Sequence, residues 1–314
     1  MRVFSLLILL VAANPALACL SFFDVPSPTP TPVVPPPVMD RLKNDHDRAY
    51  WQTRRADFEA QMAKGDFRTQ NDLAVTLVQL GELKTALSYF KAIEINQPGL
   101  YHTAANLGTT YELLGDNKNA LRWMREGLKR DAESHAGSEW IHLRILEAKL
   151  AGESSPPLEM DFGRGAYPSP PPSLPKNARG QAQTLEQIEE SLIFQLHERL
   201  QFVPAPEPIV ASLLFDLGNS VALRGEHSQA ATLYHKALEF KPVNAALVQS
   251  RKEAAQGKMS PVMRGMWALL GLAALGGCRV WRRKSRENQA RARVAFLNAE
   301  YADVGQKEYK VTVD

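Results

Sequence analysis

Residues 101–134, YHTAANLGTTYELLGDNKNALRWMREGLKRDAES, repeat the pattern of the residues before them, FRTQNDLAVTLVQLGELKTALSYFKAIEINQPGL at 67–100. Matching residues recur at a spacing of 34: Leu73 and Leu107, Ala74 and Gly108, Leu77 and Tyr111, Gly81 and Gly115, Ala86 and Ala120, Phe90 and Met124. A third copy at 211–244 has Leu217, Gly218, Val221, Gly225, Ala230, Tyr234, Ala237 and Pro242 in corresponding places. A fixed period of 34 with small residues at the eighth and twentieth places is typical of a helix–turn–helix repeat.

Each copy is predicted to be a pair of amphipathic helices joined by a tight turn. Gly108 has no side chain, so we expect the second helix to approach it closely until Ala120 meets it. Gly115 is placed to end the first helix with a positive φ, and Asp116 or Asn117 can then cap the second helix. Because one hairpin cannot bury its apolar stripe alone, neighbouring copies must stack.

This pattern resembles the tetratricopeptide repeat (TPR) family, whose hairpins stack into a right-handed superhelix. The resemblance implies an all-α fold with two groups of TPR helical hairpins joined by a Pro-rich linker. The first group is an array at 67–150, with units at 67–100 and 101–134 and a partial unit at 135–150. The second group, 184–258, consists of a helix, the unit at 211–244 and a capping helix.

Two helix starts can be placed from the local sequence. Thr184 and Gln187 form a capping box before an apolar run. Ser138 is placed to cap a helix at 139–150, in which His142 occupies a position that normally holds a small residue. This helix is therefore expected to close the first group.

Parts of the chain also resemble a set of exported bacterial TPR proteins. These parts are residues 101–115, 138–149 and 213–218, together with the Ala-Cys-Leu sequence at 18–20. The resemblance implies export and the TPR fold, and it implies no particular biochemical activity.

Residues 1–18 are predicted to be a signal peptide. Arg2 gives a minimal charged start, an apolar stretch follows, and the Ala-Leu-Ala at 16–18 fits an A-x-A cleavage site. An uncleaved anchor is disfavoured because the apolar run falls short of the ~20 residues needed to span a bilayer. Cleavage would leave Cys19 first, which makes Cys19 a candidate for lipidation, although the residues before it make a poor lipobox.

Two segments rich in proline divide the chain. Residues 19–40 are interpreted as an extended Pro-rich linker, with a ligand for a proline-reading module as the alternative. Residues 41–66 are predicted to form a charged lead-in helix that docks on the array. Residues 151–183 are interpreted as a second linker, because its prolines forbid a continuous helix.

Residues 259–281 are predicted to form a transmembrane helix. The apolar core at 265–278 covers only about 21 Å of a ~30 Å hydrocarbon layer, but flanking arginines can snorkel and flanking tryptophans suit the headgroup interface. A buried core helix is the alternative. Ala273 and Gly277 make a small-xxx-small step that could let two copies pair as a homodimer.

The tail at 282–314 is rich in arginine and lysine, so the positive-inside rule places it in the cytoplasm. The signal peptide independently predicts that the repeats face the periplasm. The chain is therefore expected to cross a bacterial inner membrane once. The net charge of +3 comes largely from this tail and indicates attraction to lipid headgroups, with no nucleic-acid partner expected.

No motif for catalysis, no cofactor site and no phosphate-binding loop is found in the sequence, so neither enzymatic activity nor a cofactor is expected. His135, Glu139 and His142 have helical spacing that could suit a metal ion, but in repeat register His142 points toward a neighbouring unit, so no metal is expected. Cys19 and Cys278 lie at the mature N-terminus and in the predicted span, so the repeats are expected to fold without a disulfide.

Stacked hairpins present a concave surface lined by the first helix of each unit, and the TPR resemblance implies that partners bind there. The predicted groove residues are Asn71, Val75, Val78, His102, Thr109, Glu112, Phe215 and Asn219. The chain departs from the Lys, Asn and Arg pattern of TPRs that grip chaperone C-termini, so a cytosolic-chaperone partner is not expected. The mixed surface fits a protein or peptide partner, unless the lead-in helix covers part of the groove.

The sequence therefore predicts a membrane-tethered extracytoplasmic TPR scaffold that binds a protein or peptide. The alternative is a transmembrane sensor or regulator that couples groove occupancy to a cytoplasmic partner of the basic tail. An envelope hydrolase is a third class, for which the sequence offers neither a metal site nor a nucleophile.

Overall fold

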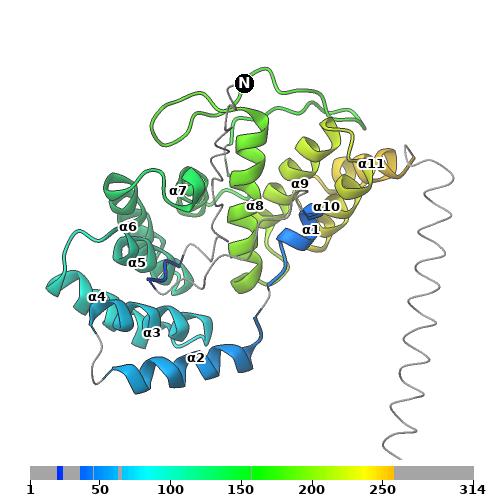
Figure 1. Ribbon diagram of the computed structural model, residues 1–314. Coiled ribbons are helices and arrows are strands. Elements are labelled where there is room, and N and C mark those ends of the chain that lie inside the picture. The colour runs from blue at the N-terminus through cyan, green and yellow to red at the C-terminus, as the bar shows by residue number, and fades with distance from the viewer. Residues whose placement is uncertain (1–19, 24–35, 45, 63–65, 157, 258–314) are drawn as a thin grey trace, which may run out of the picture. The chain divides into compact units, whose positions relative to one another are not determined.

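The computed structural model describes residues 20–23, 36–44, 46–62, 66–156 and 158–257, and their regular elements are all helices (Figure 1). The helices of the first group are α3 (Phe67–Gln79), α4 (Leu83–Asn96), α5 (Tyr101–Leu113), α6 (Asn117–Arg130), the short 3₁₀ helix η1 (His135–Gly137) and α7 (Glu139–Ala151). Those of the second group are α8 (Leu185–Phe202), α9 (Pro208–Leu223), α10 (His227–Glu239) and α11 (Ala245–Gly257). Two further helices precede the repeats, α1 (Val38–Arg41) and α2 (Arg48–Gln61).

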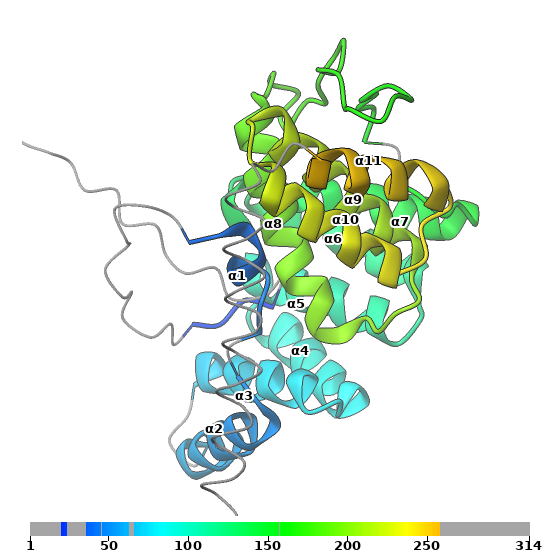
Figure 2. The same ribbon diagram turned by 90° about the vertical axis from the view of Figure 1, so that its right-hand side faces the viewer.

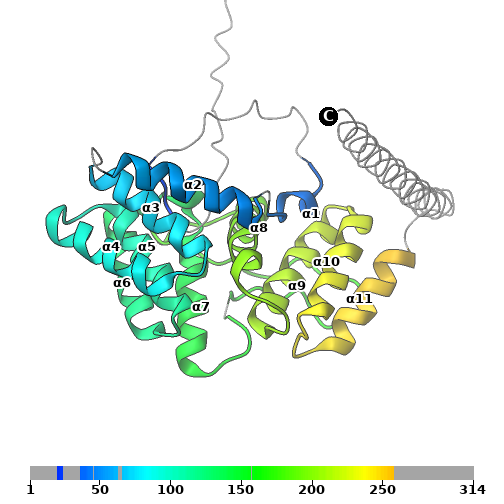
Figure 3. The same cartoon turned by 90° about the horizontal axis from the view of Figure 1, so that it is seen from below.

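The predicted repeat units are helical hairpins. The pairs α3/α4, α5/α6 and α9/α10 each pack together, and α4 packs on α5 (Figure 3). Between the two helices of each pair lies a glycine with a positive φ: 84° at Gly81, 81° at Gly115 and 88° at Gly225. Asp116 caps α6 by accepting a hydrogen bond from the Asn119 backbone N–H. The turn chemistry expected from the sequence is confirmed.

The two helices of a hairpin approach each other at a glycine, but the partner differs from the expected one. A Cβ on Gly108 would lie 2.4 Å from the Met124 sulfur, so Met124 of α6, and not Ala120, meets this glycine. In the third hairpin a Cβ on Gly218 would lie 2.7 Å from the Tyr234 ring. The prediction of Ala120 was wrong because the long side chain one turn further along α6 lies across the glycine.

Helix α8 connects the two groups. It packs against η1 and α7 of the first group and against α9 of the second. The predicted capping box is confirmed, with Thr184 and Gln187 each bonding the other's backbone. Ser138 makes no side-chain cap to α7, contrary to expectation; its hydroxyl instead accepts a hydrogen bond of 3.1 Å from the Gln195 amide of α8.

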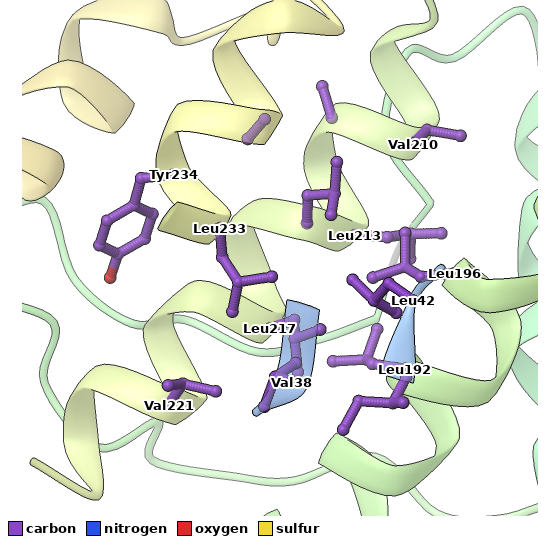
Figure 4. Packing of buried hydrophobic residues seen from close by; sticks show 14 of the residues in the cluster. Val38, Leu42, Leu192, Leu196, Val210, Leu213, Leu217, Val221, Leu233 and Tyr234 are labelled. Atoms are coloured by element: carbon purple, nitrogen blue, oxygen red, sulfur yellow. The ribbon is translucent and has the colours of Figure 1, made fainter. Parts of the chain in front are cut away.

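The predicted lead-in segment at 41–66 contains helix α2, whereas α1 lies mostly in the residues predicted to be the first Pro-rich linker, 19–40. Asp47 caps α2 by accepting the Tyr50 N–H, so this helix starts seven residues later than predicted and packs on α3. Helix α1 packs on α8 and α10. Figure 4 shows Val38 and Leu42 among Leu192 of α8 and Leu217 of α9, in the main hydrophobic core.

Gly152, with a φ of 73°, ends α7, and the described residues of the second Pro-rich segment form no helix before α8 begins. It nevertheless contributes buried side chains, because Leu158 and Phe162 are each only 3% exposed. Helices α9, α10 and α11 lie side by side (Figure 2), and α11 covers the open side of α10. Here α11 is the expected capping helix.

The predicted signal peptide at 1–18, the span at 259–281 and the tail at 282–314 lie outside the described residues. Within the described part of the chain, no helix has the length and apolar character needed to cross a bilayer.

The glycine contacts give a stability prediction. Gly218→Ala should lower the free energy of unfolding by about 1–3 kcal/mol, because the new methyl group overlaps the buried Tyr234 ring. Gly108→Ala should cost less, because the Met124 thioether can rotate away. Urea unfolding of both variants measures the difference, and equal losses would show that the ring contact does not set the helix spacing.

Candidate functional site

A short stretch of the chain's own N-terminal region, Leu20–Phe23, lies against the first helices of the first two repeats. The Ser21 N–H donates to Asn106 Oδ1 at 2.7 Å. The Ser21 carbonyl accepts from Asn71 Nδ2 at 2.7 Å and from Asn106 Nδ2 at 3.1 Å. The Phe23 N–H donates to Asp72 Oδ1 at 2.8 Å. Side chains of α3 and α5 thus bind the backbone on both sides of Ser21, and we call this arrangement the amide clamp.

The clamp is itself a connected network. Asn106 Nδ2 also donates to Asn71 Oδ1 at 2.8 Å, and Asn71 Nδ2 donates to Asp72 Oδ1 at 3.0 Å. Asn71 and Asn106 are both fully buried. Leaving a buried side-chain amide without a partner costs roughly 1–3 kcal/mol per lost hydrogen bond. The backbone of Ser21 therefore stabilises the fold by giving the buried amides of Asn71 and Asn106 hydrogen-bond partners.

The two phenylalanine side chains of the segment pack against aromatic rings of the helices. Phe22 is 8% exposed and stacks on Trp51 of α2, with 6.1 Å between ring centroids. Phe23 stacks on His102 at 4.1 Å and meets Phe67 edge-on at 5.5 Å. Burial lowers the pKa of His102, and the charge of His135 lowers it further, so the stacked imidazole is neutral at pH 7.

The structure separates the predicted groove residues into three environments. Asn71 and His102 contact the Leu20–Phe23 segment. Val75 and Val78 are buried in a cluster with Trp51 and Phe58 of α2 and are not on an open surface. Thr109, Glu112 and Phe215 line hollows. Asn219, like the two valines, is buried and not on an open surface, and its Oδ1 accepts a hydrogen bond from Arg251. Partner binding by all eight remains a prediction.

Glu112 is the centre of a buried charge network between the two groups. Its carboxylate accepts from Lys149 at 2.7 Å, Arg199 at 2.8 Å and His142 at 2.5 Å. Burial alone would raise the pKa of Glu112, but the charges of Arg199 and His142 outweigh it and hold that pKa well below its usual range. The network therefore ties α5, α7 and α8 together and lies beside a hollow of about 230 Å³.

His142 is explained by the same network. Burial would lower its pKa, but the charge of Glu112 and the hydrogen bond that Glu112 accepts raise it. A histidine thus replaces the small residue normal at this position because it joins two carboxylates, with Glu139 Oε2 3.6 Å from its Nδ1. His135 also pairs with Glu139, and the described residues include no group of ligands suited to a metal ion.

In the second group, a buried side chain likewise binds the backbone of an irregular segment, the second Pro-rich segment. Arg251 of α11 is 1% exposed and donates to the carbonyls of Phe162 at 2.9 Å and Gly165 at 3.2 Å. It also donates to Asn219 Oδ1 at 2.6 Å, and Asn219 accepts from the Tyr234 hydroxyl at 3.0 Å. The predicted groove residue Asn219 therefore orients the arginine that holds the linker.

A hollow of about 620 Å³ remains beside this segment. Ser212, Phe215 and Asp216 of α9 line one side, and Ser155 and Met160 of the linker line another. Burial raises the pKa of Asp216 to about 7, and the charge of Arg251 offsets only part of that effect. The hollow is mixed in polarity and partly closed by the Ser155–Ser212 hydrogen bond of 2.6 Å.

Several site residues were missed by the sequence reasoning. Residues 20–23 were assigned to a linker, although a Leu-Ser-Phe-Phe stretch is apolar and unlike the Pro-rich sequence after it. Asn106 was missed because it is one place out of repeat register from Asn71. Arg251 and Arg199 gave no local signal, because their partners lie far away in sequence.

A structural comparison found similarity to TTC0263, a thermophilic TPR protein of Thermus thermophilus known from a crystal structure. The two are 18% identical, the match covers 66% of this chain and 91% of that chain, and the TM-score is 0.34. A scan of protein-family models and a search of curated proteins found no match.

The charge network predicts a specific pH dependence. The raised pKa of His142 means that its contribution to stability is complete below about pH 6.5 and is lost as pH rises through its folded-state pKa. The lowered pKa values of Glu112 and Glu139 mean that their contribution is complete above about pH 4.5 and is lost in acid.

We therefore expect the urea midpoint of the wild type to fall more between pH 6 and pH 9 than that of His142→Gln, which cannot titrate. The matched control is His235→Gln, since the His235 side chain is 65% exposed on α10. It should keep the slope of the wild type. Identical slopes for the wild type and His142→Gln would contradict the network.

Proposed function

We propose that this chain, an all-α array of TPR-like hairpins, is a membrane-tethered extracytoplasmic scaffold that binds a protein or peptide partner. A TPR-like fold generally serves protein interaction, and this level of function follows from the fold. The tether, the compartment and the partner are the finer part of the proposal. They are supported by the sequence of residues 1–18, 259–281 and 282–314.

One observation carries the binding function: the helix faces predicted to form the groove bind an extended polypeptide. The amide clamp donates to and accepts from the backbone of Ser21, and these contacts do not depend on the side chain bound. Binding of a peptide backbone by polar side chains, with neighbouring pockets for the side chains, is how grooves recognise extended partners. The same face is therefore chemically suited to a peptide.

The hollows beside the two occupied faces give a partner room to extend. One is lined by Thr109 and Leu113, next to the charge network, and the other by Ser212 and Phe215. The first lies on α5 and the second on α9, both of which are first helices of a repeat. In this proposal the repeats face the periplasm, residues 259–281 cross the inner membrane, and the basic tail is cytoplasmic.

Photo-cross-linking in the native membrane tests this function. Photoreactive side chains at Leu113 and Ser212 should trap the same protein, identified by mass spectrometry. The matched control is Ile95, which is 79% exposed on α4, a second helix that does not line the groove. No cross-linked protein at Leu113 or Ser212, or the same proteins from Ile95 in equal yield, would contradict the scaffold function.

A further inference from the structure

We propose that Leu20–Phe23 occupies a peptide-binding site of its own chain. The partner of that site is an extended peptide with a similar order of residue types, and it binds by displacing Leu20–Phe23. That order is a small hydroxyl residue followed by two aromatic residues. The inference rests on the proposed function and names both its partner class and its regulation. The segment follows directly on the predicted signal peptide and Cys19.

The bonding pattern is that of a ligand in a groove. Leu20 and Phe22 are buried, and Ser21 is 8% exposed, yet the segment makes no regular secondary structure. Its backbone is bound by side chains of α3 and α5, across 50 residues for Asn71 and 85 residues for Asn106. Such contacts can be made equally by a separate peptide, because no strand or helix ladder joins the segment to the array.

The chemistry of the clamp selects the kind of peptide. Asn71 and Asn106 are neutral amides, each able to donate and accept, and together they bind the N–H and the C=O of one internal residue. Asp72 accepts the N–H of Phe23, two residues further on, and would repel a terminal carboxylate at that place. The site therefore fits the interior of an extended chain, whereas a C-terminal carboxylate would require Lys or Arg.

The rings add selectivity for the side chains. Trp51 receives the first aromatic residue, and His102 with Phe67 receives the second. Arg68 also lies with its guanidinium 5.8 Å from the Phe23 ring. Stacked and edge-on ring pairs each contribute about 0.5–1.5 kcal/mol beyond area burial, so aromatic residues at both places raise affinity. The hydroxyl of Ser21 is 3.1 Å from His135 Nε2, which favours serine before them.

Covalent attachment makes the segment a competitor. A tethered ligand acts at an effective concentration of about 1 mM or more, so a partner of equal intrinsic affinity binds only weakly while the segment is in place. Any change that pulls Leu20–Phe23 away raises the apparent affinity for the partner. Occupancy of the groove is thereby linked to the position of the N-terminal region.

The test measures binding of the peptide acetyl-Leu-Ser-Phe-Phe-Gly-Lys(fluorescein)-amide to the full chain in detergent, by fluorescence polarisation. Ser21→Pro removes the N–H that donates to Asn106, whereas the matched control Ser21→Ala keeps it. We expect the Ser21→Pro chain to bind the peptide at least tenfold more tightly than the wild type does. The Ser21→Ala chain, which keeps the N–H and loses only the hydroxyl contact with His135, should gain much less affinity for the peptide than the Ser21→Pro chain does.

A second arm changes the ligand and leaves the protein intact. The same peptide with N-methylserine lacks the N–H for Asn106 and should bind the Ser21→Pro chain at least tenfold more weakly than the parent peptide. Equal binding of the two peptides, equal affinities of the two chain variants, or unfolding of the Ser21→Pro chain by circular dichroism would overturn the inference. Membrane cross-links at Leu113 and Ser212 would still support the scaffold function in that case.

Discussion

A single helical hairpin cannot bury its own apolar surface. The packing of the other described segments follows from this constraint, because they cover the apolar faces that the hairpins leave exposed. Stacking covers the faces between α4 and α5, but a short array still has exposed ends and an exposed concave side. Here the irregular parts of the chain supply the cover. Helix α2 buries Val75 and Val78 with Trp51, α1 inserts into the core beside α8, and Leu158 packs into the core of the second group.

Two of these covers are extended segments held by polar side chains. Asn71 and Asn106 bind the backbone of Ser21, and Arg251 binds the carbonyls of Phe162 and Gly165. In both places polar side chains of the helices hold the backbone of the protein's own chain. In the proposal above, a separate partner and the internal segment therefore use the same contacts, those of Asn71 and Asn106.

The sequence predicted what depends on local chemistry. The glycine turns and the capping box at Thr184 follow from residues close together in sequence, and the structure confirms them. Contacts over long separations were not predictable in the same way. From the sequence, Glu112 was predicted to be a groove residue, and only the folded structure shows its contacts with Arg199 and His142. Leu20–Phe23 lies outside the repeats, so the 34-residue period could not predict where it binds.

Hydrogen exchange at two backbone amides tests the central claim most directly. If Leu20–Phe23 occupies the groove, the amide protons of Ser21 and Phe23 are buried in hydrogen bonds to Asn106 and Asp72 and should exchange at least about 100-fold more slowly than in an unstructured peptide of the same sequence. Exchange at the unstructured rate, measured by mass spectrometry on the full chain in detergent, would show that the groove is empty and would contradict the account.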